Sequence, residues 1–273
     1  MGSAGKIMAD TMTSGEMAAH RDRNGILLLP LGCFDMHGVQ VGMACDTFEA
    51  EAACRVLAEA LDAVVLPPIH YTFAGATGPW PGTVNLLPEQ VMAYIRAVVT
   101  AVLRNGFKRV MLVSIHGPSS MYIQMVLRSI FEETGELPIT LRPNWGDFQK
   151  WVREEFGQPH GAAASYLAAL HICGRHGEFD PSATEDETRP GTIPFDSFRD
   201  LQQHGVAAPY RYVRPEDHVG QYPGLTMDDA PRCAEAFRES ILKGIEGLPE
   251  HYEKFQADMK AALAEAPWDS YEW

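Results

Sequence analysis

The sequence predicts an α/β fold with a mainly parallel central sheet, and two observations support this prediction. First, short apolar runs alternate with longer segments in which apolar residues recur every three or four positions. This alternation is typical of strand–helix–strand units, whose right-handed crossovers make neighbouring strands parallel. Second, Asp and His residues follow directly after two of the apolar runs. In a parallel sheet these positions lie beyond the carboxyl ends of the strands, where ligands bind.

Four apolar runs are predicted to be strands. Each is short and bounded by glycine, proline or polar residues, a pattern that favours buried strands. Pro67 and Pro68, for example, stop the second run. The predicted strands cover residues 26–31, 63–66, 110–115 and 137–141.

Helices are predicted between and after these strands. The clearest begins at Pro88, since proline is well tolerated in a first turn, and ends at Asn105-Gly106. The segment from 175 to 210 is polar and is predicted to be irregular. The loop over residues 69–86 is long and rich in aromatic and proline residues, so it is predicted to be a pocket wall. Further helices are predicted over residues 14–20, 47–61, 121–133, 148–156, 162–173, 227–245 and 250–265.

Composition limits the class of protein. The 273 residues show no internal repeat and no clear domain boundary, so we predict an N-terminal extension over 1–24 and a single domain over 25–273. The net charge of −14 argues against nucleic acid and anionic membranes as partners. No apolar run is long enough to cross a membrane, and the first twenty residues show no signal-peptide pattern. Five scattered cysteines without CxxC spacing favour reduced thiols, which predicts a cytoplasmic protein.

A metal site is predicted where the strands end. Asp35 and His37 follow the first strand two residues apart, so in extended backbone both face the same side. Asp46 can return to that point through a short loop, and His116 ends the third strand. Carboxylate and imidazole groups together are a ligand set for divalent cations. The competing interpretation of Asp46 is that it only caps the following helix.

Two cysteines, Cys33 and Cys45, lie beside these predicted ligands. Cysteine is among the most frequently buried residue types, so packing as small apolar side chains is the favoured interpretation. Contact with a metal is the alternative.

An ordered set of motifs resembles the creatininase family. A Pro-Leu-Gly-x-x-acid-x-His-Gly motif is followed, nine residues after its histidine, by an aspartate. A Trp-Pro-Gly-Thr motif, a Gly-Phe-Lys-Arg segment before a strand that ends in His-Gly, and a Gly-Gln-Tyr-Pro-Gly turn come next. These are residues 30–38 with Asp46, 80–83, 106–109 with 116–117, and 220–224. The resemblance covers about residues 25–245. It implies a three-layer α/β/α domain, a homo-oligomer that is often a hexamer, and a metal-dependent hydrolase of a small cyclic amide or related C–N bond.

By position, the resemblance implies that Asp35, Asp46 and His116 hold one Zn²⁺ or Mn²⁺ ion. His37 and Asp46 would hold a second, with Asp46 bridging the two. The family usually has Glu in place of Asp35, so this side chain is one methylene shorter. A third protein ligand for the second ion is not visible in the sequence. We therefore expect one tight ion per chain and a second site that fills only at raised metal concentration.

The family's later His-Gly stretch also differs, because Glu-Thr-Ser is replaced after His160-Gly161 by residues 162–165, Ala-Ala-Ala-Ser. His160 is predicted to be the acid that protonates the leaving group, and Glu155 is a second catalytic candidate. Trp80, Thr83 and Trp145 are predicted to contact a small-molecule substrate, with core packing an equal alternative for the two tryptophans.

Two other functions stay open. One is hydrolysis of a C–C bond in a cyclic diketone, whose enolate leaving group needs less protonation than an amine. The other is a family member that has lost catalysis and binds a small molecule or a partner.

Overall fold

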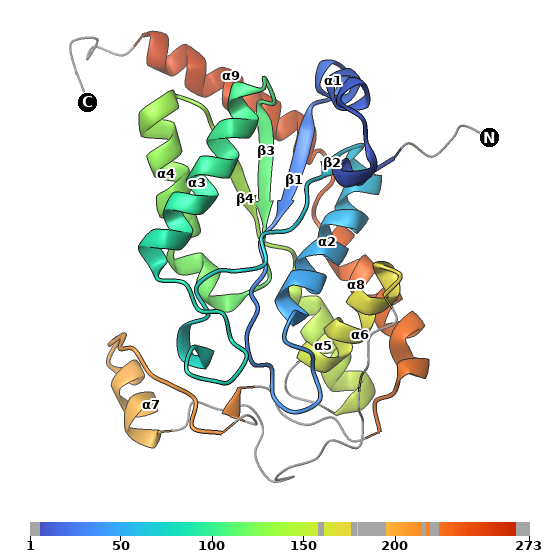
Figure 1. Cartoon of the computed structure of the whole chain (residues 1–273), viewed down its shortest axis with the longest axis vertical. Coiled ribbons are helices and arrows are strands. Elements are labelled where there is room, and N and C mark those ends of the chain that lie inside the picture. The colour runs from blue at the N-terminus through green and yellow to red at the C-terminus, as the bar shows by residue number, and fades with distance from the viewer. Residues whose placement is uncertain are drawn as a thin grey trace.

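A computed structural model of the chain confirms the predicted α/β architecture (Figure 1). It describes residues 6–157, 161–175, 179, 195–214, 217–218 and 224–265. Within these ranges four strands form one sheet in the order β2-β1-β3-β4, and every pair is parallel. The strands are β1 (Ile26–Pro30), β2 (Val64–Val65), β3 (Arg109–Val113) and β4 (Ile139–Leu141).

Helices cover both faces of the sheet, as Figure 1 shows. Leu28 of β1 points to one face and Leu29 to the other, because successive side chains alternate along a strand. Both are buried, which explains why the strand is apolar throughout. One face carries α2 (Cys45–Leu61), α5 (Trp145–Phe156), α6 (Ala162–Ile172) and α8 (Ala230–Leu242); the other carries α3 (Pro88–Arg104) and α4 (Ile123–Thr134).

The two ends of the described chain also pack on this domain. Thr13 caps α1 (Ser14–Arg23) in a capping box with Glu16, and Val65 of β2 donates its N–H to the Ile7 carbonyl at 2.7 Å. Residues 6–24 therefore lie against the edge strand. In α9 (Leu248–Ala264), the hydroxyl of Tyr252 donates to the Leu137 carbonyl at 2.6 Å. Within the described ranges, none of the helices combines the length and the apolar character that a membrane span requires.

The prediction that residues 175–210 are irregular is wrong for one part. Residues Asp196–Gln203 form a helix, α7, in which only Phe198 is buried. The Phe198 ring packs on Tyr210 at a centroid distance of 4.9 Å. A helix with a single buried apolar residue shows too little periodicity to be recognised in a sequence. Elsewhere in the described residues the predicted elements are present and differ mainly at their ends; α5, for example, begins at Trp145 rather than at 148. Most of residues 176–194 lies outside the described residues. Short 3-10 turns, η1 (Ala9–Thr11), η2 (Gly75–Thr77), η3 (Gly117–Met121) and η5 (Met227–Asp229), complete the described elements.

Candidate metal centre

Two strand ends bring the predicted ligands to one edge of the sheet. β1 and β3 pair in a register that sets Pro30 opposite Val113. The hydroxyl of Ser114 then donates to the Leu31 carbonyl at 2.9 Å and keeps the two chains together beyond the strands. The segments that carry Asp35 and His116 therefore leave the sheet side by side, as the parallel topology predicts.

A glycine lets the first turn of α2 reach the same edge. A Cβ atom on Gly32 would lie 2.2 Å from Thr47 Oγ1 and 2.4 Å from Thr47 Cα, so only glycine fits. The Thr47 hydroxyl in turn donates to the Cys33 carbonyl at 3.1 Å. The residue that caps α2 is Ala44, and Asp46 lies inside the first turn. The interpretation of Asp46 as a helix cap is therefore wrong, and its side chain faces the histidines instead.

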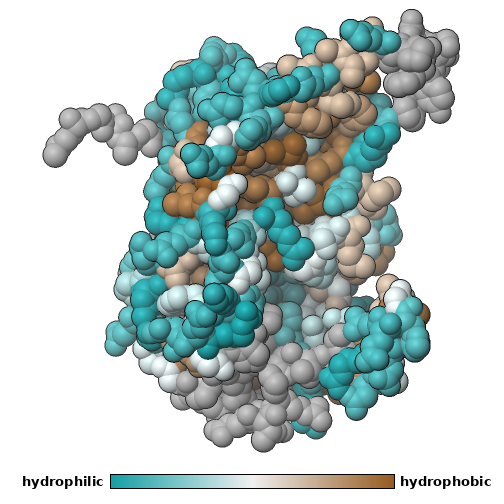
Figure 2. Space-filling model, turned by 180° about the vertical axis from the view of Figure 1, so that it is seen from behind, coloured by the Kyte–Doolittle hydropathy of each residue, from teal (hydrophilic) through white to brown (hydrophobic). Residues whose placement is uncertain are grey.

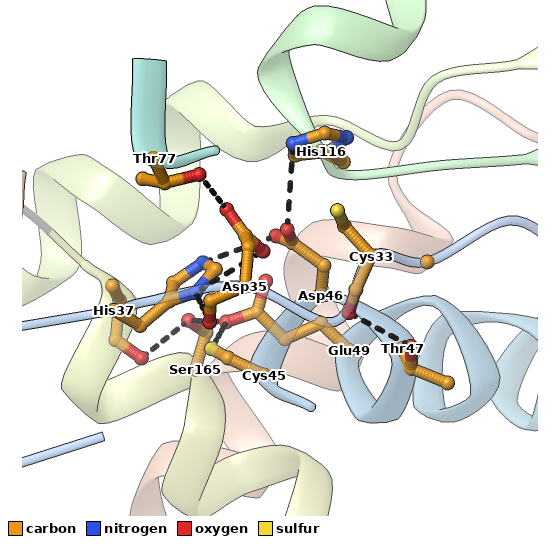
Figure 3. Close-up of polar contacts among 12 residues, drawn as sticks. Cys33, Asp35, His37, Cys45, Asp46, Thr47, Glu49, Thr77, His116 and Ser165 are labelled. Atoms are coloured by element: carbon orange, nitrogen blue, oxygen red, sulfur yellow. Dashed lines mark hydrogen bonds and ion pairs between the residues drawn. The ribbon is translucent and has the colours of Figure 1, made fainter. Parts of the chain in front are cut away.

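Asp46 lies between two imidazoles (Figure 3). Its Oδ1 is 3.4 Å from His37 Nε2, and its Oδ2 is 3.7 Å from His116 Nε2. On the other side of His37, Nδ1 is 3.6 Å from Asp35 Oδ1. All four side chains are buried. The structure thus brings together Asp35, His37, Asp46 and His116, which come from two strand ends and one helix.

Several polar atoms of this cluster are buried without a hydrogen-bond partner in the described part of the chain. They are Asp35 Oδ1, Asp46 Oδ2 and His116 Nδ1. Burying a carboxylate oxygen unpaired is costly, and a cation removes that cost. Ligand atoms of Cys33, Asp35, Asp46 and His116 lie within 4.8 Å of one another. Ligands about 2.0–2.3 Å from one ion can lie up to roughly 4.5 Å apart, so these residues fit a divalent cation after small movements.

The pKa values of the titratable groups in this cluster shift in different directions. Burial alone would lower the pKa of His37, but the carboxylates of Asp46 and Asp35 raise it to about 10. Burial raises the pKa of Asp35, whereas the imidazoles of His116 and His37 outweigh burial at Asp46 and hold its pKa well below the ordinary value. Burial also raises the pKa of the Cys33 thiol. Two adjacent buried carboxyls with opposite shifts need positive charge between them before both can ionise.

Thr77 is a site residue that the sequence did not reveal. Its hydroxyl, at the end of η2, donates to Asp35 Oδ2 at 2.6 Å. This bond holds the shorter Asp35 side chain in place. A threonine in a long loop has no metal-binding chemistry of its own, so only its contact with Asp35 identifies it.

Glu49 is a second residue that the sequence did not reveal. It follows Asp46 by three residues on α2, is 3% exposed and lies in the cavity wall. Its Oε1 accepts from the Cys45 thiol at 3.1 Å and from the Ser165 hydroxyl of α6. Burial, reinforced by the charge of Asp46, raises the pKa of Glu49 to about 7. The available signal was a charged residue on the inner face of a predicted helix.

The cluster forms the floor of a cavity of about 570 Å³. This volume is in the range of small-molecule sites. The loop over residues 73–77 forms one wall, as predicted for the long loop. Aromatic and cationic side chains complete the lining, among them Phe73, Arg142, Trp145, Tyr210, Arg211 and Tyr212.

The remaining predicted site residues lie in different places. Trp145 lines the cavity and also packs on Phe148, a position compatible with both predicted roles. The Thr83 hydroxyl accepts the Met36 N–H at 3.2 Å, and neither Thr83 nor Trp80 lines the cavity. Glu155 is exposed on α5 and pairs with Arg232, away from the cavity. His160 lies outside the described residues.

A family comparison agrees with the motifs and the geometry. The sequence model of the creatininase family, described as creatinine amidohydrolase, matches residues 10–213. The chain belongs to the creatininase family. The creatinine amidohydrolase of Pseudomonas putida is 28% identical over 103 residues, which cover 36% of this chain and 40% of that protein. The match therefore spans less than half of the relative.

Solved creatininase structures share the fold at low sequence identity. A mutant creatininase complexed with creatine has a TM-score of 0.69 at 18% identity, covering 88% of this chain and 98% of that one. A mutant of Zn-Zn type also scores 0.69 at 19% identity, with coverage of 89% and 98%. A manganese creatininase scores 0.68 at 19% identity, with coverage of 88% and 98%. The creatininase-like fold predicted from the sequence is confirmed.

Proposed function

We propose that this creatininase-family protein is a metal-dependent hydrolase that opens a small cyclic amide or cleaves a related C–N bond. The observation that carries the proposal is the buried Asp46 carboxylate, whose two oxygens face two different histidines. That arrangement suits a cation ligand better than a structural ion pair, because Asp46 Oδ2 keeps no hydrogen-bond partner among the described residues. The zinc and manganese named for the family's solved structures are consistent with it.

Asp35, Asp46 and His116 are the residues that would hold the first ion, with Cys33 as a further donor. Zn²⁺ or Mn²⁺ suits mixed carboxylate and imidazole ligands, and a thiolate would favour Zn²⁺. A bound divalent cation supplies a nucleophilic water at neutral pH and polarises the substrate carbonyl. The hydrogen bond from Thr77 fixes Asp35 Oδ2, so Asp35 Oδ1 would be left to contact a bound ion.

The leaving nitrogen of an amide must gain a proton, and Glu49 is the described residue best suited to hold it. Its carboxyl lies in the cavity wall with a pKa of about 7, so a proton is available near neutral pH. Cys45 and Ser165 keep the carboxyl in place. His160, predicted to be the acid, stays a second candidate. The flat rings of Trp145 and Tyr212 in the lining suit a cyclic substrate.

The experiment measures metal content and ring opening together. Metal-loaded protein is incubated with creatinine, with other five- and six-membered cyclic amides, and with a cyclic 1,3-diketone, and the products are followed by mass spectrometry. We expect metal-dependent opening of a cyclic amide. Asp46→Asn should lose most bound metal and nearly all activity while circular dichroism stays unchanged.

Each alternative function gives a different result. Opening of the diketone alone would favour the C–C hydrolase. A full metal content with no turnover of any ring would favour a protein that only binds small molecules. An Asp46→Asn variant with its full metal content would show that the assignment of Asp46 is wrong.

A further inference from the structure

A third histidine lies beside the centre, and it comes from a distant part of the chain. The His218 ring is 4.8 Å from the His37 ring, centroid to centroid, at an interplanar angle of 59° (ring planes tilted). Ligand atoms of Asp35, His37 and His218 lie within 4.8 Å of one another. This second group shares only Asp35 with the group that contains Cys33 and His116.

Contacts of Tyr212 and of the neighbouring Asp217 fix the position of His218. Tyr212 stacks on the His218 ring at 4.9 Å and 29°, and its N–H donates to the Ala76 carbonyl at 3.3 Å. The neighbouring carboxylate of Asp217, which is 1% exposed, accepts the N–H groups of Val213 and Arg214 at 3.2 and 2.9 Å. The turn that carries His218 is therefore docked on the loop that also holds Thr77, as expected for a built site.

The orientation of the His37 ring also suits a second ion. His37 Nδ1 lies 3.1 Å from the Asp35 carbonyl oxygen. With a proton kept on Nδ1 for that contact, a bound cation would replace the proton on Nε2, which gives the usual arrangement of a metal-bound histidine. His37 Nε2 is 3.4 Å from Asp46 Oδ1, while the other Asp46 oxygen faces His116. Asp46 therefore directs one oxygen toward the His37 side of the centre and the other toward the His116 side.

We propose that His218 is the protein ligand that completes the second metal position implied by the family resemblance, beside Asp35, His37 and the shared Asp46. The proposal rests on the metal-dependent function proposed above and changes the expected metal count from one tight ion to two. His218 supplies the protein ligand that the sequence motifs lack. With it, the second position has three protein ligands besides the shared Asp46, and catalytic metal sites usually keep three. The ligand atoms of Asp35, His37 and His218 lie within 4.8 Å of one another. Small side-chain movements would therefore bring each of them to the usual distance of about 2.0–2.2 Å from one shared ion.

The test is a titration of metal-free protein with Zn²⁺, and separately with Mn²⁺, by isothermal calorimetry with a parallel count by mass spectrometry of the metal. His218→Phe keeps a ring against Tyr212 and His37 but removes the ligand. His218→Asp restores a ligand of another type. His171→Phe makes the same change at an exposed histidine of α6 and is the matched control. Circular dichroism checks that each variant is folded.

We expect two ions per chain in the parent, in His218→Asp and in His171→Phe, and one in His218→Phe. In His218→Phe the affinity for the second ion should fall by more than the roughly 10–100-fold that is lost when an outer partner of a metal ligand is removed. Two ions of unchanged affinity in His218→Phe, or a single ion in the parent, would overturn the second site and leave the first intact. A parent that binds no ion would instead overturn the proposed function.

Discussion

Asp46 and Glu49 lie one helical turn apart on α2, yet their pKa values shift in opposite directions. The imidazoles of His116 and His37 outweigh burial at Asp46 and lower its pKa. The Glu49 carboxyl accepts hydrogen bonds from the neutral Ser165 and Cys45 side chains, and burial raises its pKa to about 7. Neighbouring carboxyls with separated pKa values are suited to different tasks. Asp46 is charged and available to a cation, whereas Glu49 can carry a proton.

The raised pKa of Glu49 predicts a pH-dependent stability in the metal-free protein. Between its ordinary pKa of 4.5 and about 7, the folded state holds a proton that the unfolded state has lost. Stability from this group is therefore full below pH 4.5 and falls as the pH rises through about 7. At about 1.36 kcal/mol per pKa unit, the loss amounts to roughly 3 kcal/mol. Glu49→Gln should remove this contribution, measured by urea unfolding with a chelator present.

The matched control is Glu154→Gln, which makes the same change at an exposed glutamate of α5 that pairs with Lys150. Its stability should follow the parent across the whole pH range. Parallel pH curves for the parent and Glu49→Gln would show that Glu49 is not protonated in the folded state.

At the scale of elements, the site depends on how closely the first turn of α2 approaches the end of β1. Gly32 permits that approach, and the Thr47 hydroxyl holds it through the Cys33 carbonyl. Asp46 precedes Thr47, so a displacement of this turn moves the carboxylate that lies between the histidines. Close packing of a helix against a strand end therefore determines where the candidate ligand Asp46 lies.

Gly32→Ala should destabilise the protein and weaken metal binding together. The added Cβ would overlap the backbone of α2, and overpacking of this kind costs about 1–3 kcal/mol. Thermal unfolding and zinc calorimetry measure the two effects. The control is Gly15→Ala in α1, where the nearest atom to the new Cβ is 4.0 Å away. A Gly32→Ala variant with the parent's unfolding temperature would contradict the close approach.

At the scale of the whole molecule, exposed apolar surface raises the question of what covers it, and the resemblance implies a homo-oligomer. Figure 2 shows hydrophobic residues gathered across the upper half of the back of the molecule, with hydrophilic residues around them. Apart from the surface in that view, Met121, which also lines the cavity, is 73% exposed, and Met125 on α4 is 62% exposed. Exposed apolar surface is typical of interaction sites where it is extensive. We infer that further copies of the chain cover part of it.

Light scattering at micromolar concentration should give a mass that is a multiple of 30.1 kDa. Met125→Lys should lower that mass, because burying a charge in an apolar contact is unfavourable. A parent protein that elutes at 30.1 kDa across the concentration range would rule out the assembly.

Local sequence patterns were sufficient to predict the parallel α/β topology and the four candidate ligands Asp35, His37, Asp46 and His116. Both come from local patterns, namely apolar runs, helical spacing and motifs of adjacent residues. The register of β1 and β3 then makes Asp35 and His116 neighbours, because parallel strands end at one edge. These inferences needed no knowledge of contacts between distant segments. The short helix α7 was missed for the same reason, since its local pattern is weak.

Packing between distant segments places further side chains beside the candidate ligands. Thr77, Glu49 and His218 reach it from a loop, a helix face and a turn near the end of the chain. None belongs to a motif, and each is brought there by packing: η2 against Asp35, α2 against α6, and Tyr212 against the loop at Ala76. Pairs separated by more than a hundred residues, such as Glu49 and Ser165, leave no periodic signal in one sequence. Their proximity follows from close packing between distant segments, which pairs most buried polar atoms.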